Sequence, residues 1–236
     1  MNTQEASFRL AAVVVAAGSG TRMGTNFPKQ YALIEGKTML EHSVSALLEE
    51  PRIEQLVIVI SPSDLIGQQL KFTDPRVKIA RVGGASRADS IRNGITYSGL
   101  SANDWVLTHD AARPCVKASD VAKLIDYCLK TDEGGILAVP VSDTIKQQNA
   151  AGKIGKTIPR DKLWAAQTPQ CFKVGPLTKA LSNTEAVVTD EASAMEASGF
   201  KPALIEGSST NFKVTRPADL ALARAVFRAR AAGDDI

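Results

Sequence analysis

Short, strongly apolar segments alternate along the chain with segments of helical periodicity, and no other feature of the sequence restricts the fold as much. The first apolar segment, Arg9–Ala16, is rich in valine and runs into glycines, as expected of a strand buried on both faces. Similar segments follow at Leu56–Ile60, Val77–Val82, Trp105–Thr108 and Gly135–Val141. Helices are predicted over Met39–Leu48, Ser86–Tyr97 and Ser119–Leu129. This alternation predicts βαβ units with right-handed crossovers, and therefore an α/β fold on a mostly parallel sheet.

Composition indicates an ordinary globular protein. With 236 residues, 44% of them hydrophobic, the chain can form one sizeable core, so we expect a single domain spanning residues 1–236. A net charge of +3 without long basic runs argues against a nucleic-acid or membrane surface. Cys115, Cys128 and Cys171 are too widely spaced to predict a disulfide framework or a zinc site. Because the chain shows no signal pattern and no apolar stretch of roughly 20 residues, a cytoplasmic location is expected.

The regular pattern is interrupted by a polar segment over about residues 142–163. It is a candidate β-hairpin that closes near Asn149–Gly152 and projects as an arm. The alternative is a solvated surface loop, although irregular segments of this length are usually functional or disordered. Regular structure is expected to resume after it, with Thr189 capping a helix that carries Asp190 and Glu191 in its first turn. Thr215 is expected to cap the last helix, which has Pro217 early in it and ends near Arg230.

The loop after the first predicted strand, Ala16–Gly24, has the sequence AAGSGTRMG. A glycine-rich turn at the carboxyl end of a central strand lets backbone N–H groups approach a phosphate. The glycines are spaced G-x-G-x-x-x-G, which differs from the dinucleotide fingerprint, and the Walker GK[ST] ending is missing. Arg22 and Lys29 supply two cations nearby, which suits a triphosphate and the charge that develops during phosphoryl transfer. A tight turn beside two solvated cations is the alternative interpretation of the loop taken alone.

Together with the PKQ that follows it, this loop resembles the signature of the nucleotidyltransferases that activate sugars and alcohols. Four further segments narrow the resemblance: GGASRADSIRNG at Gly83–Gly94, HDAARP at His109–Pro114, TDEASAME at Thr189–Glu196 and NFKVTRPADL at Asn211–Leu220. In this order they resemble the 2-C-methyl-D-erythritol 4-phosphate cytidylyltransferase family, from about Ala12 to Leu222.

The resemblance implies a Rossmann-like nucleotidyltransferase fold, a sheet flanked by helices, and an arm that exchanges between the subunits of a homodimer. It also implies one reaction: the cytidylyl group of CTP is transferred to 2-C-methyl-D-erythritol 4-phosphate, with release of pyrophosphate, in isoprenoid precursor biosynthesis by the non-mevalonate route. The nucleotide-binding residues that it implies are Ala16, Ala17, Gly18, Gly20, Gly84, Ala85, Ser90 and Asp110. Because no room remains after the last helix, a monofunctional enzyme is expected.

The resemblance also assigns catalytic roles. It implies that Arg22 and Lys29 stabilise the transition state, and that Lys213 and Arg160 position the attacking phosphate, with Arg160 coming from the partner subunit. Asp110, Arg113, Thr144 and Thr189 are the further substrate-binding candidates, and both threonines could equally be structural. Asp110 is also the one candidate metal ligand, although Mg²⁺ is expected to be held mainly by the phosphates. A turn residue is the alternative for Asp110.

Two other functions stay open at this point. A ribitol 5-phosphate cytidylyltransferase would have a similar donor loop and a different acceptor pocket, and Thr144 and Arg160 favour the methylerythritol enzyme over it. A regulatory protein that binds CTP without turnover is the second alternative. The presence of Arg22, Lys29, Asp110 and Lys213 argues against it. His109 is expected to be structural, because a phosphate nucleophile is already ionised at pH 7 and needs no general base.

Overall fold

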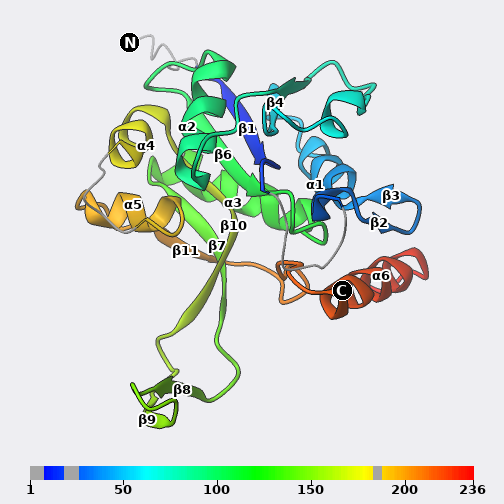
Figure 1. Ribbon diagram of the computed structural model, residues 1–236. Helices are drawn as coiled ribbons and strands as arrows, with labels where there is room; N and C mark the ends of the chain where they lie inside the picture. Colours follow the sequence, from blue (N-terminus) through cyan, green and yellow to red (C-terminus); the bar gives the residue numbers. More distant parts are fainter. Residues whose placement is uncertain (1–7, 19–26, 183–187) are drawn as a thin grey trace.

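A seven-stranded sheet forms the centre of the computed structural model, which describes residues 8–18, 27–182 and 188–236 (Figure 1). Its strands lie side by side in the order β11 (Ala203–Glu206), β7 (Gly135–Pro140), β10 (Trp164–Lys173), β6 (Trp105–Asp110), β1 (Leu10–Val15), β4 (Gln55–Val59) and β5 (Val77–Ala80). Only β10 runs antiparallel to its two neighbours in this sheet. The mostly parallel sheet predicted from the sequence is therefore confirmed, and each predicted strand is present.

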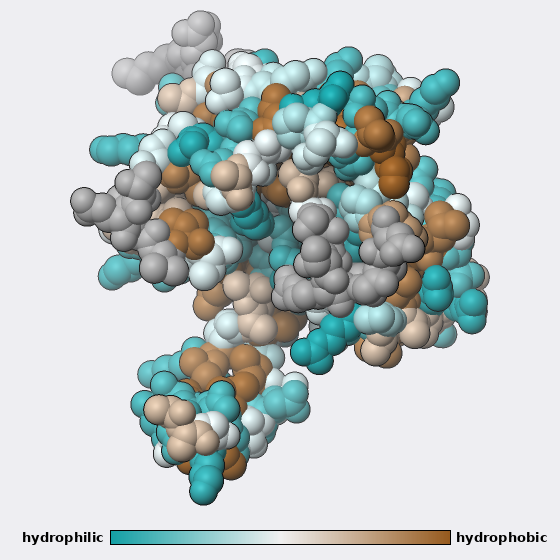
Figure 2. Space-filling view, viewed as in Figure 1, coloured by the Kyte–Doolittle hydropathy of each residue, from teal (hydrophilic) through white to brown (hydrophobic). Residues whose placement is uncertain are grey.

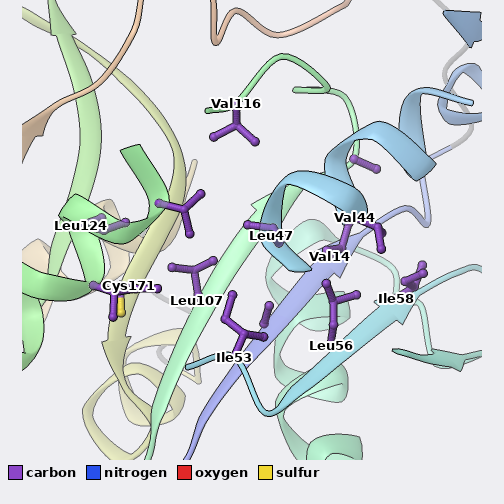
Figure 3. Packing of buried hydrophobic residues seen from close by; sticks show 14 of the residues in the cluster. Val14, Val44, Leu47, Ile53, Leu56, Ile58, Leu107, Val116, Leu124 and Cys171 are labelled. Carbon is purple, nitrogen blue, oxygen red and sulfur yellow. The ribbon is translucent and has the colours of Figure 1, made fainter. Parts of the chain in front are cut away.

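Helices cover both faces of the sheet, as Figure 1 shows. One face carries α1 (Met39–Leu48) and α3 (Ala118–Thr131), and the other carries α2 (Arg87–Ser98), α4 (Val174–Leu181) and α5 (Glu191–Ala197). Side chains of β1 alternate between the two layers, because successive residues of a strand point to opposite faces. Val14 packs with Val44 and Leu47 of α1 in the cluster drawn in Figure 3, whereas Val13 joins the cluster of α2. Both faces of β1 are therefore buried, as its continuous apolar sequence predicts.

Two helix caps differ from the sequence-based prediction. The cap of α5 is Asp190 and not Thr189: the Asp190 carboxylate accepts the Ser193 N–H at 2.9 Å, and Ser193 Oγ accepts the Asp190 N–H in return. Helix α6 (Pro217–Ala231) is capped at Arg216 and not at Thr215, whose hydroxyl donates to Asp219. Both helices start one residue later than predicted. At α5 the Asp190 carboxylate accepts an N–H group of the first turn, whereas at α6 the Asp219 carboxylate accepts the N–H groups of Thr215 and Arg216 before the helix.

The irregular segment after β7 forms a projecting arm. Strands β8 (Ile145–Gln148) and β9 (Ile154–Ile158) pair antiparallel, and Asn149 closes the turn through its backbone and side-chain contacts with Lys153. Gly152 has a φ of 76°, a conformation that favours glycine. The hairpin predicted from the sequence is confirmed. It extends away from the sheet in Figure 1 and forms a projecting lobe in Figure 2.

A third, smaller layer packs the segment before α1 against the last helix. The 3-10 helix η2 (Lys29–Tyr31) leads into a two-stranded ribbon of β2 (Leu33–Ile34) and β3 (Lys37–Thr38), and α6 packs against it. A second 3-10 helix, η3 (Gly67–Gln69), lies between β4 and β5. This layer places Lys29 and Lys213 beside the carboxyl ends of β1 and β6. Within the described ranges, no helix is both long and apolar enough to cross a bilayer.

Candidate active site

A cavity of about 370 Å³ opens at the carboxyl ends of β1 and β6. The chain runs from β1 outward through β4 to β5 and then returns to place β6 on the other side of β1, so the strand order reverses between β1 and β6. Open α/β sheets bind ligands at such a reversal, because the loops that leave the two strands diverge there. The cavity volume lies within the roughly 300–1,000 Å³ typical of small-molecule sites.

One wall is the GGAS segment that leads into α2. Ser86 caps this helix by accepting the Asp89 N–H, and the Asp89 carboxylate accepts the Ser86 N–H. Ser90 is buried, and its hydroxyl accepts the Gly84 N–H at 3.0 Å while donating to the Ser86 carbonyl. A Cβ at Gly84 would lie 2.4 Å from the Asp89 Cβ, so only glycine fits there. The segment therefore presents a fixed helix N-terminus to the cavity, an environment that favours anions.

The opposite wall is the backbone of Ala16, Ala17 and Gly18, directly after β1. The Ala16 N–H donates to the Val59 carbonyl, and the buried Gln30 amide donates to the Ala16 carbonyl at 2.7 Å. These contacts hold the start of the glycine loop at the strand end, where its N–H groups can approach a ligand.

The cavity floor holds a chain of alternating charges. Asp110 Oδ1 accepts from Arg87 Nε at 2.8 Å, and Asp110 Oδ2 pairs with Lys213 Nζ at 2.7 Å. Arg87 Nη1 also contacts both oxygens of the fully buried Glu191, at 2.9 and 2.8 Å. Burial opposes ionisation of Asp110, but Arg87 and Lys213 outweigh it and hold its pKa well below the ordinary value. For Glu191 burial dominates, and its pKa is raised although Arg87 favours the charged form.

Lys213 lies on a segment that is fixed by contacts from the loop after β6 and from β10. Arg113 Nη1 donates to the Asn211 carbonyl at 2.7 Å, and the Asn211 amide donates to Gln167 and to the Thr168 carbonyl. On the other side of Lys213, the Val214 N–H donates to the Ala112 carbonyl. Lys29 Nζ donates to the Val214 carbonyl at 2.7 Å, so both lysines meet at this segment.

Most of the site residues predicted from the sequence line this one cavity. These are Ala16, Ala17, Gly18, Lys29, Gly84, Ala85, Ser90, Asp110 and Lys213. Arg22 and Gly20 lie outside the described residues. Asp110 is the last residue of β6, so it is fixed by the sheet and is not simply a turn residue.

Four predicted residues are not among the described lining residues. Arg113 lies behind the cavity and uses its guanidinium to hold the Asn211 and Ala166 carbonyls. Thr189 precedes the α5 cap, and its hydroxyl donates to Ser193. Thr144 and Arg160 lie on the arm beside the ends of β8 and β9, where Arg160 donates to the Ser142 carbonyl. The fold brings the donor-side residues together within one chain and leaves these two arm residues apart from them.

Sequence reasoning missed three residues that the site uses. Gln30 and Arg87 line the cavity, and Glu191 lies behind Arg87. Each one lies in a segment already associated with the resemblance. The sequence analysis assigned no role to these three residues, because contacts between residues far apart in the sequence leave no pattern within a short segment.

His109 is completely buried next to Asp110. Its Nε2 faces the Arg113 carbonyl, which can only accept, so Nε2 carries the proton and Nδ1 accepts from the Thr168 hydroxyl. Burial lowers the pKa of His109 to about 4. These contacts support the expected structural role, since a neutral imidazole satisfies both partners.

The neutral His109 predicts a pH dependence of stability. Because its pKa falls from 6.5 to about 4 on folding, the unfolded chain takes up the proton first as the pH drops, and stability is lost through that window. Between about pH 7 and pH 5 we expect the wild type to lose about 2 kcal/mol more free energy of unfolding than His109→Gln. Urea denaturation at both pH values measures this. His42, whose pKa burial also lowers, contributes equally to both proteins. Equal losses in the two proteins would contradict the prediction.

Comparisons with known proteins agree with this geometry. The family model described as 2-C-methyl-D-erythritol 4-phosphate cytidylyltransferase matches residues 10–229. The chain is 46% identical over 221 residues to the protein of that name from Laribacter hongkongensis, covering 93% of this chain and 96% of the relative. It is similar to the crystal structure of the Francisella tularensis 2-C-methyl-D-erythritol 4-phosphate cytidylyltransferase, with a TM-score of 0.79, 33% identity, and coverage of 92% and 99% of the two chains. A crystal structure of a 4-diphosphocytidyl-2C-methyl-D-erythritol synthase gives a TM-score of 0.82 at 37% identity, covering 94% and 100%.

Proposed function

The chain belongs to the 2-C-methyl-D-erythritol 4-phosphate cytidylyltransferase family, and we propose that the cavity at the ends of β1 and β6 is where it carries out the family's reaction. It is a nucleotidyltransferase that joins the cytidylyl group of CTP to 2-C-methyl-D-erythritol 4-phosphate in isoprenoid biosynthesis. In this proposal the cavity residues divide between two tasks: they bind and polarise the triphosphate of CTP, and they position the phosphate of the acceptor.

The charge balance of the cavity is the observation that carries the proposal. Lys29, Arg87 and Lys213 stand against one carboxylate, Asp110, among the described lining residues. Backbone N–H groups of Ala17 and Gly18 and the N-terminus of α2 add further positive potential. A polyanion such as a nucleoside triphosphate suits this combination, and its pyrophosphate half would lie toward Lys29.

The reaction needs no covalent intermediate, since an acceptor phosphate oxygen attacks the α-phosphorus in line while pyrophosphate leaves. Lys29 stabilises charge on the transferring group, and Arg22 joins it by the resemblance. Lys213 holds the acceptor phosphate. Lys213 Nζ pairs with Asp110 at 2.7 Å, and an ammonium group has three N–H donors. It can therefore keep this contact while it donates to the acceptor phosphate.

Mg²⁺ is proposed as the divalent cation, carried mainly by the phosphates of CTP. Within the described parts of the chain, no three acidic, histidine or cysteine side chains are grouped to hold a metal. Both oxygens of Asp110 are engaged by Arg87 and Lys213, so this carboxylate can contribute to metal binding only after Lys213 moves. Mg²⁺ often keeps its waters and binds through substrate phosphates and one or two carboxylates, which fits this site. When bound, it would neutralise phosphate charge.

The proposed functional unit is a homodimer of single-domain subunits that exchange the arm over about residues 142–163. A lone two-stranded hairpin is marginally stable in water. Ile154 of β9 is 67% exposed, and Figure 2 shows apolar and polar residues mixed on the projecting lobe. A partner subunit would cover this surface. It would also receive Thr144 and Arg160, which lie on the arm and are not among the lining residues of the cavity in their own chain.

Acceptor recognition is assigned to residues around the open side of the cavity. Arg160 of the partner and Lys213 would hold the phosphate, since an arginine fork can donate two parallel hydrogen bonds. Asp110 would accept ligand hydroxyls, and Thr144, Thr189 and Arg113 would contact the carbon chain or its hydroxyls. The cytoplasm is the proposed location, with which three free, buried cysteines are compatible.

Pyrophosphate release tests the proposal. The purified protein would be given CTP, Mg²⁺ and 2-C-methyl-D-erythritol 4-phosphate, beside ribitol 5-phosphate and a sample without acceptor. Release with the methylerythritol phosphate alone is expected. Release only with ribitol 5-phosphate would refute the assigned acceptor, and no release from folded protein that binds CTP would favour a regulatory role.

A further inference from the structure

The ion pair between Arg87 and Glu191 joins two parts of the site that are far apart in sequence. Arg87 is in the first turn of α2, on the donor side of the cavity, and Glu191 is in the first turn of α5, next to Thr189. Arg87 Nη1 contacts both Glu191 oxygens, and its Nε contacts Asp110 at 2.8 Å. Asp110 in turn pairs with Lys213 at 2.7 Å. Four alternating charges therefore run from the helix layer to the cavity.

A contribution to folding stability does not by itself explain the ion pair between Arg87 and Glu191. The Glu191 side chain is 0% exposed, and taking a carboxylate and a guanidinium out of water costs as much as their attraction returns, so that apolar side chains of similar size often serve equally well. The arrangement also leaves Arg87 Nη2 buried without a hydrogen-bond partner among the described residues. Burying an unpaired donor is costly. The guanidinium therefore pairs with two carboxylates, although its Nη2 has no hydrogen-bond partner among the described residues.

We propose that Arg87 and Glu191 form a positioning pair that fixes the Asp110 carboxylate, and through it the Lys213 ammonium, for binding of the acceptor phosphate. Glu191 holds the guanidinium so that only its Nε reaches Asp110, and Oδ2 of Asp110 stays directed at Lys213. Neither Arg87 nor Glu191 needs to touch the acceptor. The inference rests on the roles proposed above for Asp110 and Lys213.

The expected consequence is a selective loss on the acceptor side. Glu191→Gln keeps the shape of the side chain and removes its charge, so Arg87 is held less firmly and Asp110 shifts. We expect kcat/KM for the acceptor to fall roughly 10-fold, mainly through a higher KM, with the KM for CTP changed less than about 2-fold. Arg87→Lys should behave similarly, because a compact ammonium cannot bridge two carboxylates as a planar guanidinium does.

A double substitution separates positioning from folding. Arg87→Met combined with Glu191→Met removes both buried charges with similar volume, so thermal stability should recover relative to either single Met variant. If the pair positions Asp110, the acceptor KM stays raised in this stable double variant. If the pair only stabilises the fold, activity recovers with stability, and the inference is overturned.

Two reference variants complete the experiment. Glu50→Gln disrupts a comparable pair, in which a buried glutamate binds Arg52 away from the cavity, and it should change stability without changing either KM. Lys213→Ala tests the roles on which the inference rests. A normal acceptor KM in Glu191→Gln beside an impaired Lys213→Ala overturns the inference alone, whereas normal values in both overturn the proposed role of Lys213 as well.

Discussion

Replacing Lys29 with alanine is expected to lower kcat for pyrophosphate release by roughly 10² or more, the usual effect of losing one preorganised stabiliser of transition-state charge. Lys29 enters the cavity from η2, and its ammonium is already held by the Val214 carbonyl at 2.7 Å. Since this contact holds the ammonium in place, little reorganisation is needed during the reaction. Steady-state kinetics with saturating CTP and acceptor measure the effect.

Two controls accompany this prediction. Lys29→Met keeps the aliphatic stem and removes the charge, so it should be as inactive as the alanine variant. Lys37→Ala removes an exposed lysine of β3, outside this cavity, and should retain full turnover. Turnover of Lys29→Ala within about 3-fold of wild type, from protein of unchanged melting temperature, would show that Lys29 has no catalytic role.

Replacing Arg160 with alanine is expected to reduce kcat/KM for the acceptor by roughly 10², with little change in the KM for CTP. Arg160 follows β9 of the arm, which projects away from the sheet in Figure 1, and it does not line the cavity of its own chain. If it acts in the partner's cavity, the defect can be complemented. A mixed dimer of Arg160→Ala and Lys29→Ala subunits would hold one intact site, formed by Lys29 of one chain and Arg160 of the other.

Coexpression of the two variants with different affinity tags tests this exchange. Random pairing should restore roughly a quarter of wild-type activity, because half of the dimers are mixed and each has one intact site. Lys29→Ala paired with Lys213→Ala is the matched control: both lysines line one cavity of a single chain, so no site is restored. Absence of recovery in the first mixture would mean that Arg160 does not act across subunits.

Local pattern predicted the strands and the main helices well. Strand β1 is identifiable because it is buried on both faces and therefore apolar throughout, and α1 was predicted with its observed bounds. The direction of a strand was harder to predict. Strand β10 is antiparallel because the chain returns to the sheet through the arm, and hydrophobic periodicity carries no information on strand direction. The two caps were displaced by one residue because carboxylates of neighbouring residues, Asp190 and Asp219, accept the backbone N–H groups at the helix starts.

Site residues could be predicted where a sequence motif itself requires a particular backbone conformation. Gly84 is required because no side chain fits beside Asp89, and this requirement is visible in the sequence as a glycine before a helix start. Gln30 and Glu191 have no such local signature. Each was identified only when the fold placed it against a group far away in the sequence: Gln30 against the Ala16 carbonyl, and Glu191 against Arg87.

Short segments of the chain are enough to predict the α/β alternation, the glycine loop, the cations available for phosphate chemistry and, through the motifs, the family. Those properties are local, since they depend on side-chain period, backbone freedom and residue type within short segments. Which charges meet depends instead on the three-dimensional fold. Asp110 lies between Arg87 and Lys213 because the end of β6, the start of α2 and the segment before α6 converge at one sheet edge. Ion pairing depends on distance and burial in three dimensions, and neither is encoded in any one segment.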